Sequence, residues 1–195
     1  MASDLVILGV DPSLSSTGYS IIKVDKDKVD DVEPPHKETL FDDTKDYRPK
    51  LVTYGVIETS KKDNLCLRNK KARDRMERII KDYEPDVMSC EDQYSSLNAS
   101  TLKKLSHIRG QFMTLAEEYN IPFYLYYPSS AKKIFSGDGS AGKDKMIKTA
   151  NGYYDLDLIT KSNPDYNNNQ QQDNEADAIG LGLCYLLNKD KATKL

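Results

Sequence analysis

Hydrophobic residues follow two periods along the chain, and these predict alternating strands and helices. Residues 5–10, with the sequence LVILGV, form a continuous apolar run that is typical of a strand buried on both faces. Residues 17–22 predict a second strand after a short turn, and residues 51–59 predict a third. Shorter apolar runs at residues 87–90 and 121–127 predict two more strands.

Apolar residues three or four positions apart predict the helices. One stripe covers residues 72–83, a second covers residues 102–119, and a shorter helix is expected over residues 143–150. The last helix is expected to open near Asp173. This order of elements predicts an α/β fold, a five-stranded mixed β-sheet flanked by α-helices, as a single domain over residues 1–195.

Two polar segments interrupt the predicted core. Residues 23–50 hold three prolines and many acids, so we expect a long, mobile insertion between the second and third strands. Residues 155–172 are rich in Asn and Gln and predict a solvated loop.

Composition narrows the class of protein. Charged residues make up 30% of the chain, hydrophobic residues 38%, and the mean hydropathy is -0.67. No apolar run approaches the roughly 20 residues that a membrane span needs. The first residues carry no basic leader, and three distant cysteines with two histidines fit neither a disulfide scaffold nor a zinc site. We therefore expect a cytoplasmic protein with no membrane partner.

The net charge of -3 hides strong segregation. Residues 25–46 hold nine acids and four lysines, residues 68–81 hold seven bases and two acids, and residues 132–148 hold five lysines and two aspartates. One such run by itself is typical of a solvated face.

Three acids stand where elements of the predicted fold end or begin. Asp11 follows the first buried strand, Glu91 follows the strand after the first long helix, and Asp177 lies early in the last helix. If the two strands are adjacent and parallel, both carboxylates project from one edge of the sheet. Neighbouring strands are about 4.8 Å apart, so the two acids could share a metal. Such oxygen ligands suit Mg²⁺, and two ions would support phosphodiester hydrolysis. Each acid alone also fits a turn, a strand end or a helix N-terminus.

Four segments resemble RuvC-type Holliday junction resolvases of the RNase H-like superfamily. They are GVDPSLSSTGYSII from Gly9, PDVMSCEDQY from Pro85, SGDGSAGKD from Ser136 and NEADAI from Asn174. They occur in the family's order over about residues 5–187. The first alone would not be specific, because actin-like ATPases also use an aspartate–glycine turn after their first strand.

The resemblance implies an RNase H-like nuclease domain that cuts four-way or three-way DNA junctions by paired nicks, as a homodimer. It implies that Asp11, Glu91, the residue at position 174 and Asp177 bind Mg²⁺, with Mn²⁺ as a substitute, and that two ions act per site. It implies that Lys143 approaches the scissile phosphate and that Lys132 or Lys133 does likewise. Beside the resemblance, we expect DNA contacts from Ser13, Arg109 and Lys145, and from Tyr94, which could stack on an unpaired base or be a packed loop aromatic. The long insertion and small size are consistent with a phage or other compact-genome origin.

One position departs from the family pattern. The family places an acid three residues before its last aspartate, and here that position is Asn174. An amide can offer a neutral oxygen ligand but cannot act as a base. Asp173, four residues before Asp177, could reach the same helix face or cap the helix instead. Either these residues suffice naturally, or Asn174 is a deliberate Asp→Asn change that permits binding without cutting.

The glycine-rich segment before Lys143 superficially fits a P-loop. A P-loop needs Ser or Thr after its lysine and a position between a buried strand and a helix, whereas Asp144 follows here. We therefore expect no nucleotide cofactor, and expect a flexible loop that carries Lys143 and Lys145 to DNA phosphates. The leading hypothesis is a metal-dependent junction endonuclease. The alternatives are a branched-DNA-binding module weakened by Asn174 and an actin-like ATPase.

Overall fold

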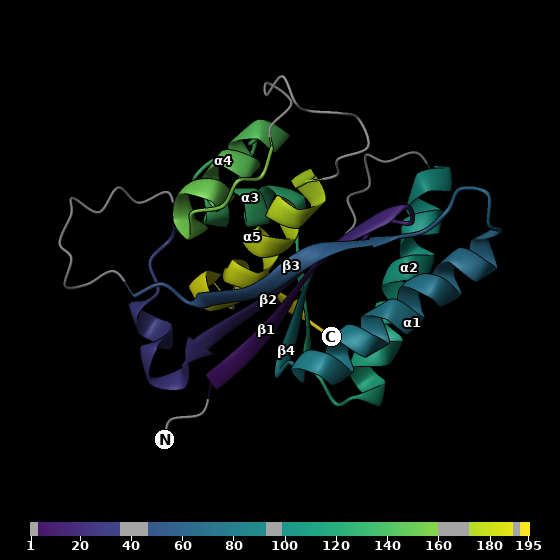
Figure 1. Ribbon diagram of the computed structural model, residues 1–195, viewed down its shortest axis with the longest axis horizontal. Helices are drawn as coiled ribbons and strands as arrows, with labels where there is room; N and C mark the ends of the chain where they lie inside the picture. The colour runs from purple at the N-terminus through teal and green to yellow at the C-terminus, as the bar shows by residue number, and fades with distance from the viewer. Residues whose placement is uncertain (1–3, 36–46, 93–98, 160–171, 189–191) are drawn as a thin grey trace.

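A computed structural model of the chain describes residues 4–35, 47–92, 99–159, 172–188 and 192–195. At its centre is a six-stranded mixed sheet with the strand order β3-β2-β1-β4-β5-β6 (Figure 1). The strands are β1 (Asp4–Asp11), β2 (Ser16–Asp25), β3 (Lys50–Glu58), β4 (Val87–Glu91), β5 (Phe123–Tyr126) and β6 (Thr193–Lys194). The first three form an antiparallel meander, and β4 and β5 run parallel to β1.

The predicted mixed sheet is confirmed, with one strand more than the five expected. β6 pairs antiparallel with β5 at the edge of the sheet. It has only two residues and both are exposed, so it leaves no alternating pattern in the sequence.

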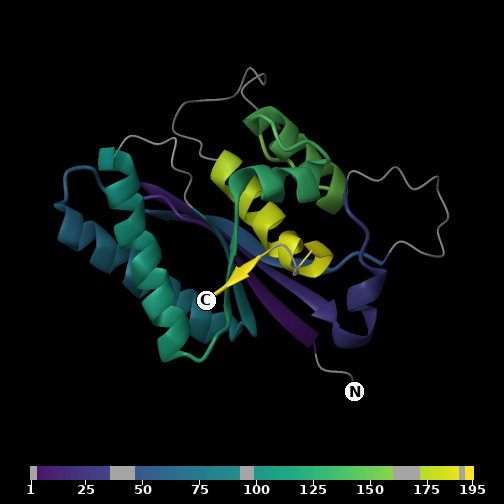
Figure 2. The ribbon, with the colours of Figure 1, turned by 180° about the vertical axis from the view of Figure 1, so that it is seen from behind.

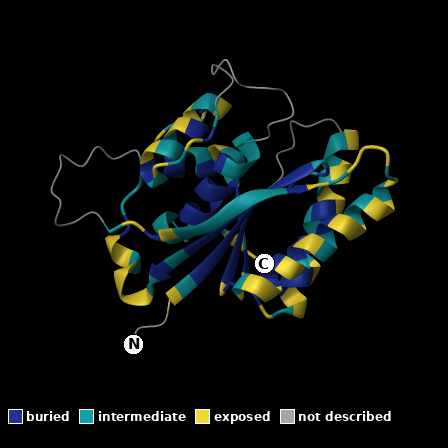
Figure 3. Cartoon of the chain, in the orientation of Figure 1, coloured by how far each residue is buried: buried dark blue, intermediate teal, exposed yellow. Residues whose placement is uncertain are grey.

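Helices cover both faces of the sheet (Figures 1 and 2). On one face lie α1 (Leu65–Tyr83) and α2 (Ala99–Glu118). On the other lies α5 (Gln172–Asn188), and α3 (Pro128–Ser136) and α4 (Lys143–Tyr154) pack against it. The strands between these layers are mostly buried, and the exposed positions gather on the outer faces of the helices (Figure 3).

β1 supplies both hydrophobic cores, as its continuous apolar run predicts. Leu8 and Val10 pack with the α1–α2 layer, and Ile7 packs with the α4–α5 layer. Successive residues of a strand point to opposite faces, so every second residue of β1 faces α5. That alternation decides which side chains at the end of β1 can meet α5.

Helix α3 has only nine residues and was not predicted from the sequence. Its buried residues Ala131, Ile134 and Phe135 have helical spacing, and Pro128 stands in its first turn. Gly137 ends it with φ of 78°, a left-handed conformation that favours glycine. Pro128 and Gly137 were the sequence signals that could have predicted the two ends of this helix.

The described parts of the predicted insertion are anchored rather than mobile. β2 extends to Asp25, and a 3₁₀ helix, η1 (Lys26–Asp31), follows. The Asp25 N–H donates to Tyr47 Oη at 3.0 Å, and Arg48 Nη1 donates to the Tyr153 carbonyl oxygen at 3.1 Å. Residues 36–46 lie outside the described residues, as do residues 160–171 of the predicted polar loop.

None of the described helices combines the length and the apolar character that a bilayer span requires. The prediction that residues 1–195 form a single domain stays a prediction.

Candidate active site

Asp11 and Glu91 end neighbouring strands. β1 and β4 pair in parallel, with Gly9 opposite Ser89 and Val10 opposite Cys90. The next residue of each strand is the acid, so the two carboxylates stand side by side at the carboxyl edge of the sheet. The predicted adjacency of these strands is confirmed.

Both acids face α5. Gly9 and Ser89 lie two residues before the acids and therefore point to the same face of the sheet. The Ser89 hydroxyl donates to the Leu181 carbonyl oxygen of α5 at 2.5 Å. A Cβ added at Gly9 would lie 2.6 Å from the Gly182 nitrogen. The acids are therefore on the side of the sheet where a helix backbone comes close.

Small residues on β2 complete this close approach. The Ser20 hydroxyl donates to the Ala178 carbonyl oxygen at 2.8 Å. A Cβ at Gly18 would lie 2.6 Å from the carbonyl carbon of Asn174, so only glycine fits there without moving α5. Asp177 directly precedes Ala178, so these contacts hold the third acid beside the other two. This role of the small residues was not predicted from the sequence, and its only signal was that they share one face of three strands.

Burial and neighbouring carboxylates raise the pKa of all three acids. Burial raises the pKa of Asp11 well above its usual range, and the charges of Glu91 and Asp177 raise it further. Burial, followed by the charge of Asp177, raises the pKa of Glu91 to about 7. Burial raises the pKa of Asp177 to about 6 despite the opposing charge of Lys132. This edge of the sheet thus concentrates negative charge that a cation would relieve.

The side chains of Asn174 and Asp173 have different partners. The Asn174 side chain is turned towards β2, where its Nδ2 donates to the Ser16 carbonyl oxygen at 2.9 Å. Asp173 pairs with Lys143, and its charge raises the pKa of both Asp11 and Asp177. The fourth acidic group near the site is therefore Asp173.

The predicted lysines lie on helices near the acids. Lys132 is on α3, and its charge opposes the raised pKa of Glu91 and of Asp177. The expectation of a flexible loop carrying Lys143 and Lys145 is wrong, because both residues belong to the first turn of α4. The glycine segment before them joins two helices, which is not the context of a P-loop.

The other predicted DNA-binding residues are dispersed. Arg109 on α2 forms an ion pair with Asp92, the residue after Glu91. Lys133 lies in the last turn of α3, and Lys145 pairs with Asp138 at 3.4 Å. The Ser13 N–H donates to Thr17 Oγ1 at 3.2 Å, inside the β1–β2 turn. Tyr94 lies outside the described residues.

The donor set fits a hard divalent cation. Carboxylate oxygens at one partly buried edge are the ligands that such ions take, and a cation would remove the mutual repulsion of these acids. Among the described residues, no group of three or more His, Cys, Asp or Glu side chains is already arranged to hold a metal ion.

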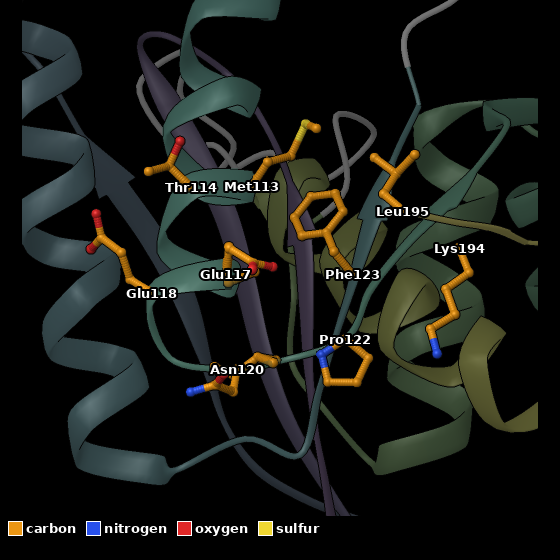
Figure 4. Close-up of a pocket in the computed structure, with 11 residues that line it drawn as sticks. Met113, Thr114, Glu117, Glu118, Asn120, Pro122, Phe123, Lys194 and Leu195 are labelled. Carbon is orange, nitrogen blue, oxygen red and sulfur yellow. The ribbon is translucent and has the colours of Figure 1, made fainter.

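A cavity of about 680 Å³ lies away from these acids. It is lined by the C-terminal part of α2, the start of β5 and the chain end at Lys194 and Leu195 (Figure 4). Its wall at Phe123 belongs to the start of β5, whereas Glu91 stands opposite Tyr126 at the far end of that strand. It is therefore not part of the candidate site.

Comparisons with known proteins identify the family to which most of the chain is similar. Residues 7–185 match the family described as "Crossover junction endodeoxyribonuclease RuvC". The RuvC of Rickettsia conorii is 28% identical over 187 residues, covering 95% of this chain and 99% of that protein. The RuvC of Petrotoga mobilis is 29% identical over 181 residues, covering 93% of each.

Solved structures show the same fold. The Thermus thermophilus RuvC in complex with a Holliday junction substrate superposes with a TM-score of 0.72 at 20% identity, covering 98% of this chain and 99% of that chain. The RNase H-like architecture predicted from the sequence is thereby confirmed. With the family match covering nearly its whole length, the chain belongs to the crossover junction endodeoxyribonuclease RuvC family.

Proposed function

We propose that this chain is a Holliday junction resolving endonuclease whose site is formed by Asp11, Glu91 and Asp177. Family membership supports the activity, and crossover junction endodeoxyribonucleases are metal-dependent in general. The observation that carries the site assignment is the convergence of three acids with raised pKa values at the carboxyl edge of β1 and β4. Buried acids with raised pKa values that lie together are typical of functional sites.

Asp11, Glu91 and Asp177 are proposed to hold two Mg²⁺ ions, or Mn²⁺ as a substitute, with substrate oxygens completing the coordination shell. When bound, such ions activate the attacking water and stabilise the leaving oxygen. We assign the fourth carboxylate to Asp173 in place of Asn174, since Asp173 is the one whose charge acts on Asp11 and Asp177.

Lys132 and Lys143 are proposed to bind the scissile phosphate. Their charges act on the acids, so they lie close enough to reach a phosphate placed beside them. Lys143 is held by Asp173 while no DNA is bound, and a phosphate oxygen would compete for it. A cation held there stabilises the charge that develops on the phosphate during cleavage.

The remaining predicted contacts, those of Ser13, Tyr94, Arg109, Lys133 and Lys145, belong to the proposed DNA surface. We further propose that the protein acts as a homodimer, because a twofold pair of sites matches the symmetry of a four-way junction and permits two equivalent nicks. The insertion at residues 23–50 has no assigned role in this proposal.

A second candidate follows from Asn174. An amide turned towards Ser16 provides neither charge nor base, so the chain could bind branched DNA and cut it poorly. The test is a nicking assay on a labelled four-way junction with Mg²⁺ or Mn²⁺, comparing the unmodified chain with Asn174→Asp. We expect symmetrical nicks from the unmodified chain and none with a chelator present. Tight junction binding without nicks, together with strong nicking by Asn174→Asp, would establish the binding-only role instead.

A further inference from the structure

Arg68, in the first turn of α1, reaches across to the turn that joins β1 and β2. Its Nη2 donates to the Leu14 carbonyl oxygen at 3.0 Å and to Ser15 Oγ at 2.9 Å. Its Nε donates to Thr59 Oγ1 at 3.0 Å. One guanidinium therefore ties helix α1, the end of β3 and the turn together.

Thr59 holds the same turn from a second side. Its N–H donates to the Ser15 carbonyl oxygen at 2.9 Å, and its hydroxyl donates to the Leu14 carbonyl oxygen. Inside the turn, Thr17 Oγ1 donates to the Ser13 carbonyl oxygen at 2.6 Å. Residues 13–15 are thus fixed at three successive carbonyl groups.

This turn begins at the residue after Asp11. Asp11 ends β1 opposite Gly18, and only residues 12–15 separate it from β2, which begins at Ser16. A displacement of the turn would change the orientation of the Asp11 carboxylate relative to Glu91 and Asp177. Catalytic groups need supporting side chains that hold them to within about 0.5 Å.

The helix turn that carries Arg68 is itself fixed. Asn64 caps α1, with its Oδ1 accepting from the Leu67 N–H at 2.9 Å. The neighbouring bases behave differently, since Lys70 pairs with Asp74 and Lys71 pairs with Asp63. Within the described residues Arg68 makes no ion pair, and its donors go to neutral oxygens of the turn and of Thr59.

We propose that Arg68 is a positioning residue of the nuclease site, which orients Asp11 for metal binding by holding the β1–β2 turn. This inference rests on the proposed function, which assigns Asp11 to the metal. The planar guanidinium spans acceptors on two elements, and a lysine, with a single nitrogen, cannot reproduce that arrangement.

The test compares Arg68→Ala, Arg68→Lys and Thr59→Val with the unmodified chain, and uses Arg78→Ala as the matched control. Arg78 is an exposed arginine on the same helix, away from the turn. Three quantities are measured well below the unfolding temperatures: Mn²⁺ affinity without DNA by calorimetry, junction Kd in chelator and the single-turnover cleavage rate. Tm is measured separately by thermal melts.

For Arg68→Ala we expect Mn²⁺ affinity to fall about fivefold or more and cleavage to slow about 20-fold or more, with junction Kd within about threefold. Arg68→Lys should share both defects. Thr59→Val, which keeps all charges, should show smaller losses in the same direction, and it tests the proposal even if Arg68→Ala does not fold. Arg78→Ala should match the unmodified chain.

Two results would overturn the proposal. Weaker junction binding that Arg68→Lys restores, with Mn²⁺ affinity unchanged, would make Arg68 a phosphate contact. A lower Tm with unchanged Mn²⁺ affinity and cleavage rate would make it only a stabilising residue. If the unmodified chain does not cut junctions, the proposed function fails, and the Mn²⁺ isotherms still decide whether Arg68 orients a metal site.

Discussion

The two faces of the sheet are built from different residues. One face mainly stabilises the fold, and the other allows α5 to come close to the strands. The face under α1 and α2 is packed with large apolar side chains, including Leu8, Met76 and Phe112. The face under α5 carries glycine and serine near the carboxyl edge, where the helix backbone touches the strands. The first arrangement stabilises the fold by burial, and the second sacrifices side-chain burial to bring Asp177 against Asp11 and Glu91.

The largest expected effect comes from removing one acid of the α5 face. Asp11→Asn should lower cleavage of a four-way junction by about 10³-fold or more, because a ligand charge central to the site is lost. Junction affinity in chelator should stay within about threefold, since removing negative charge near phosphate does not weaken attraction. Gel-shift and nicking assays on one preparation measure both. A tenfold loss of affinity would contradict the separation of binding from cutting.

A substitution at Gly9 should disturb the close approach of α5 to the sheet. Gly9→Ala places a Cβ against the backbone of α5, which cannot yield as a flexible side chain would. We expect a loss of about 1–3 kcal/mol in the free energy of unfolding and a fall of about 100-fold in cleavage by the folded protein, because Asp177 moves with α5.

Met76→Ala on the opposite face is the matched control. Met76 lies on α1 and is fully buried against the sheet, so its truncation should cost about 2–5 kcal/mol. Cleavage per folded molecule should change little, since no acid of the site rests on Met76. Urea titrations and single-turnover rates under folding conditions separate the two effects. Equal loss of cleavage in both variants would show that the faces are not specialised.

The places of Asp11 and Glu91 at the ends of strands could be predicted from the sequence, because apolar runs show where strands end. The residues that bring α5 close were harder to identify. Gly9, Gly18 and Ser89 become one surface only once their strands are known to be neighbours, and hydrophobicity carries no signal for them. Likewise, a helix turns about 100° per residue, so the choice between Asp173 and Asn174 depends on the rotation of α5.

A smaller effect is expected from a cation at the rim of the α5 face. Lys143→Ala should slow single-turnover cleavage about 10- to 100-fold while changing junction Kd less than about threefold. Lys148→Ala, an exposed lysine one turn further along α4, is the control and should retain the unmodified rate. Equal losses in rate and affinity for Lys143→Ala would make it an ordinary backbone contact.

The smallest expected effect is on the free energy of unfolding, and it comes from the raised pKa of Glu91 on the α5 face. A carboxyl whose pKa is raised on folding contributes stability that is fully present below its unfolded pKa and is lost as pH rises through the folded value. For Glu91 that window runs from its usual value of 4.5 to about 7. Without metal, Glu91→Gln should therefore be more stable than the unmodified chain at pH 8, by about 1–2 kcal/mol or some 2–8 °C in Tm.

At pH 4 the gain should vanish, because Glu91 is then protonated in both folded and unfolded chains. Added Mg²⁺ should raise the Tm of the unmodified chain at pH 8 more than that of Glu91→Gln, since binding to the folded state adds stability. Glu117→Gln, at an exposed acid on α2, should show neither effect. Thermal melts in chelator across this pH range measure the difference. A gain that persists at pH 4 would trace the stabilisation to packing, and the acids of the α5 face would then not oppose folding.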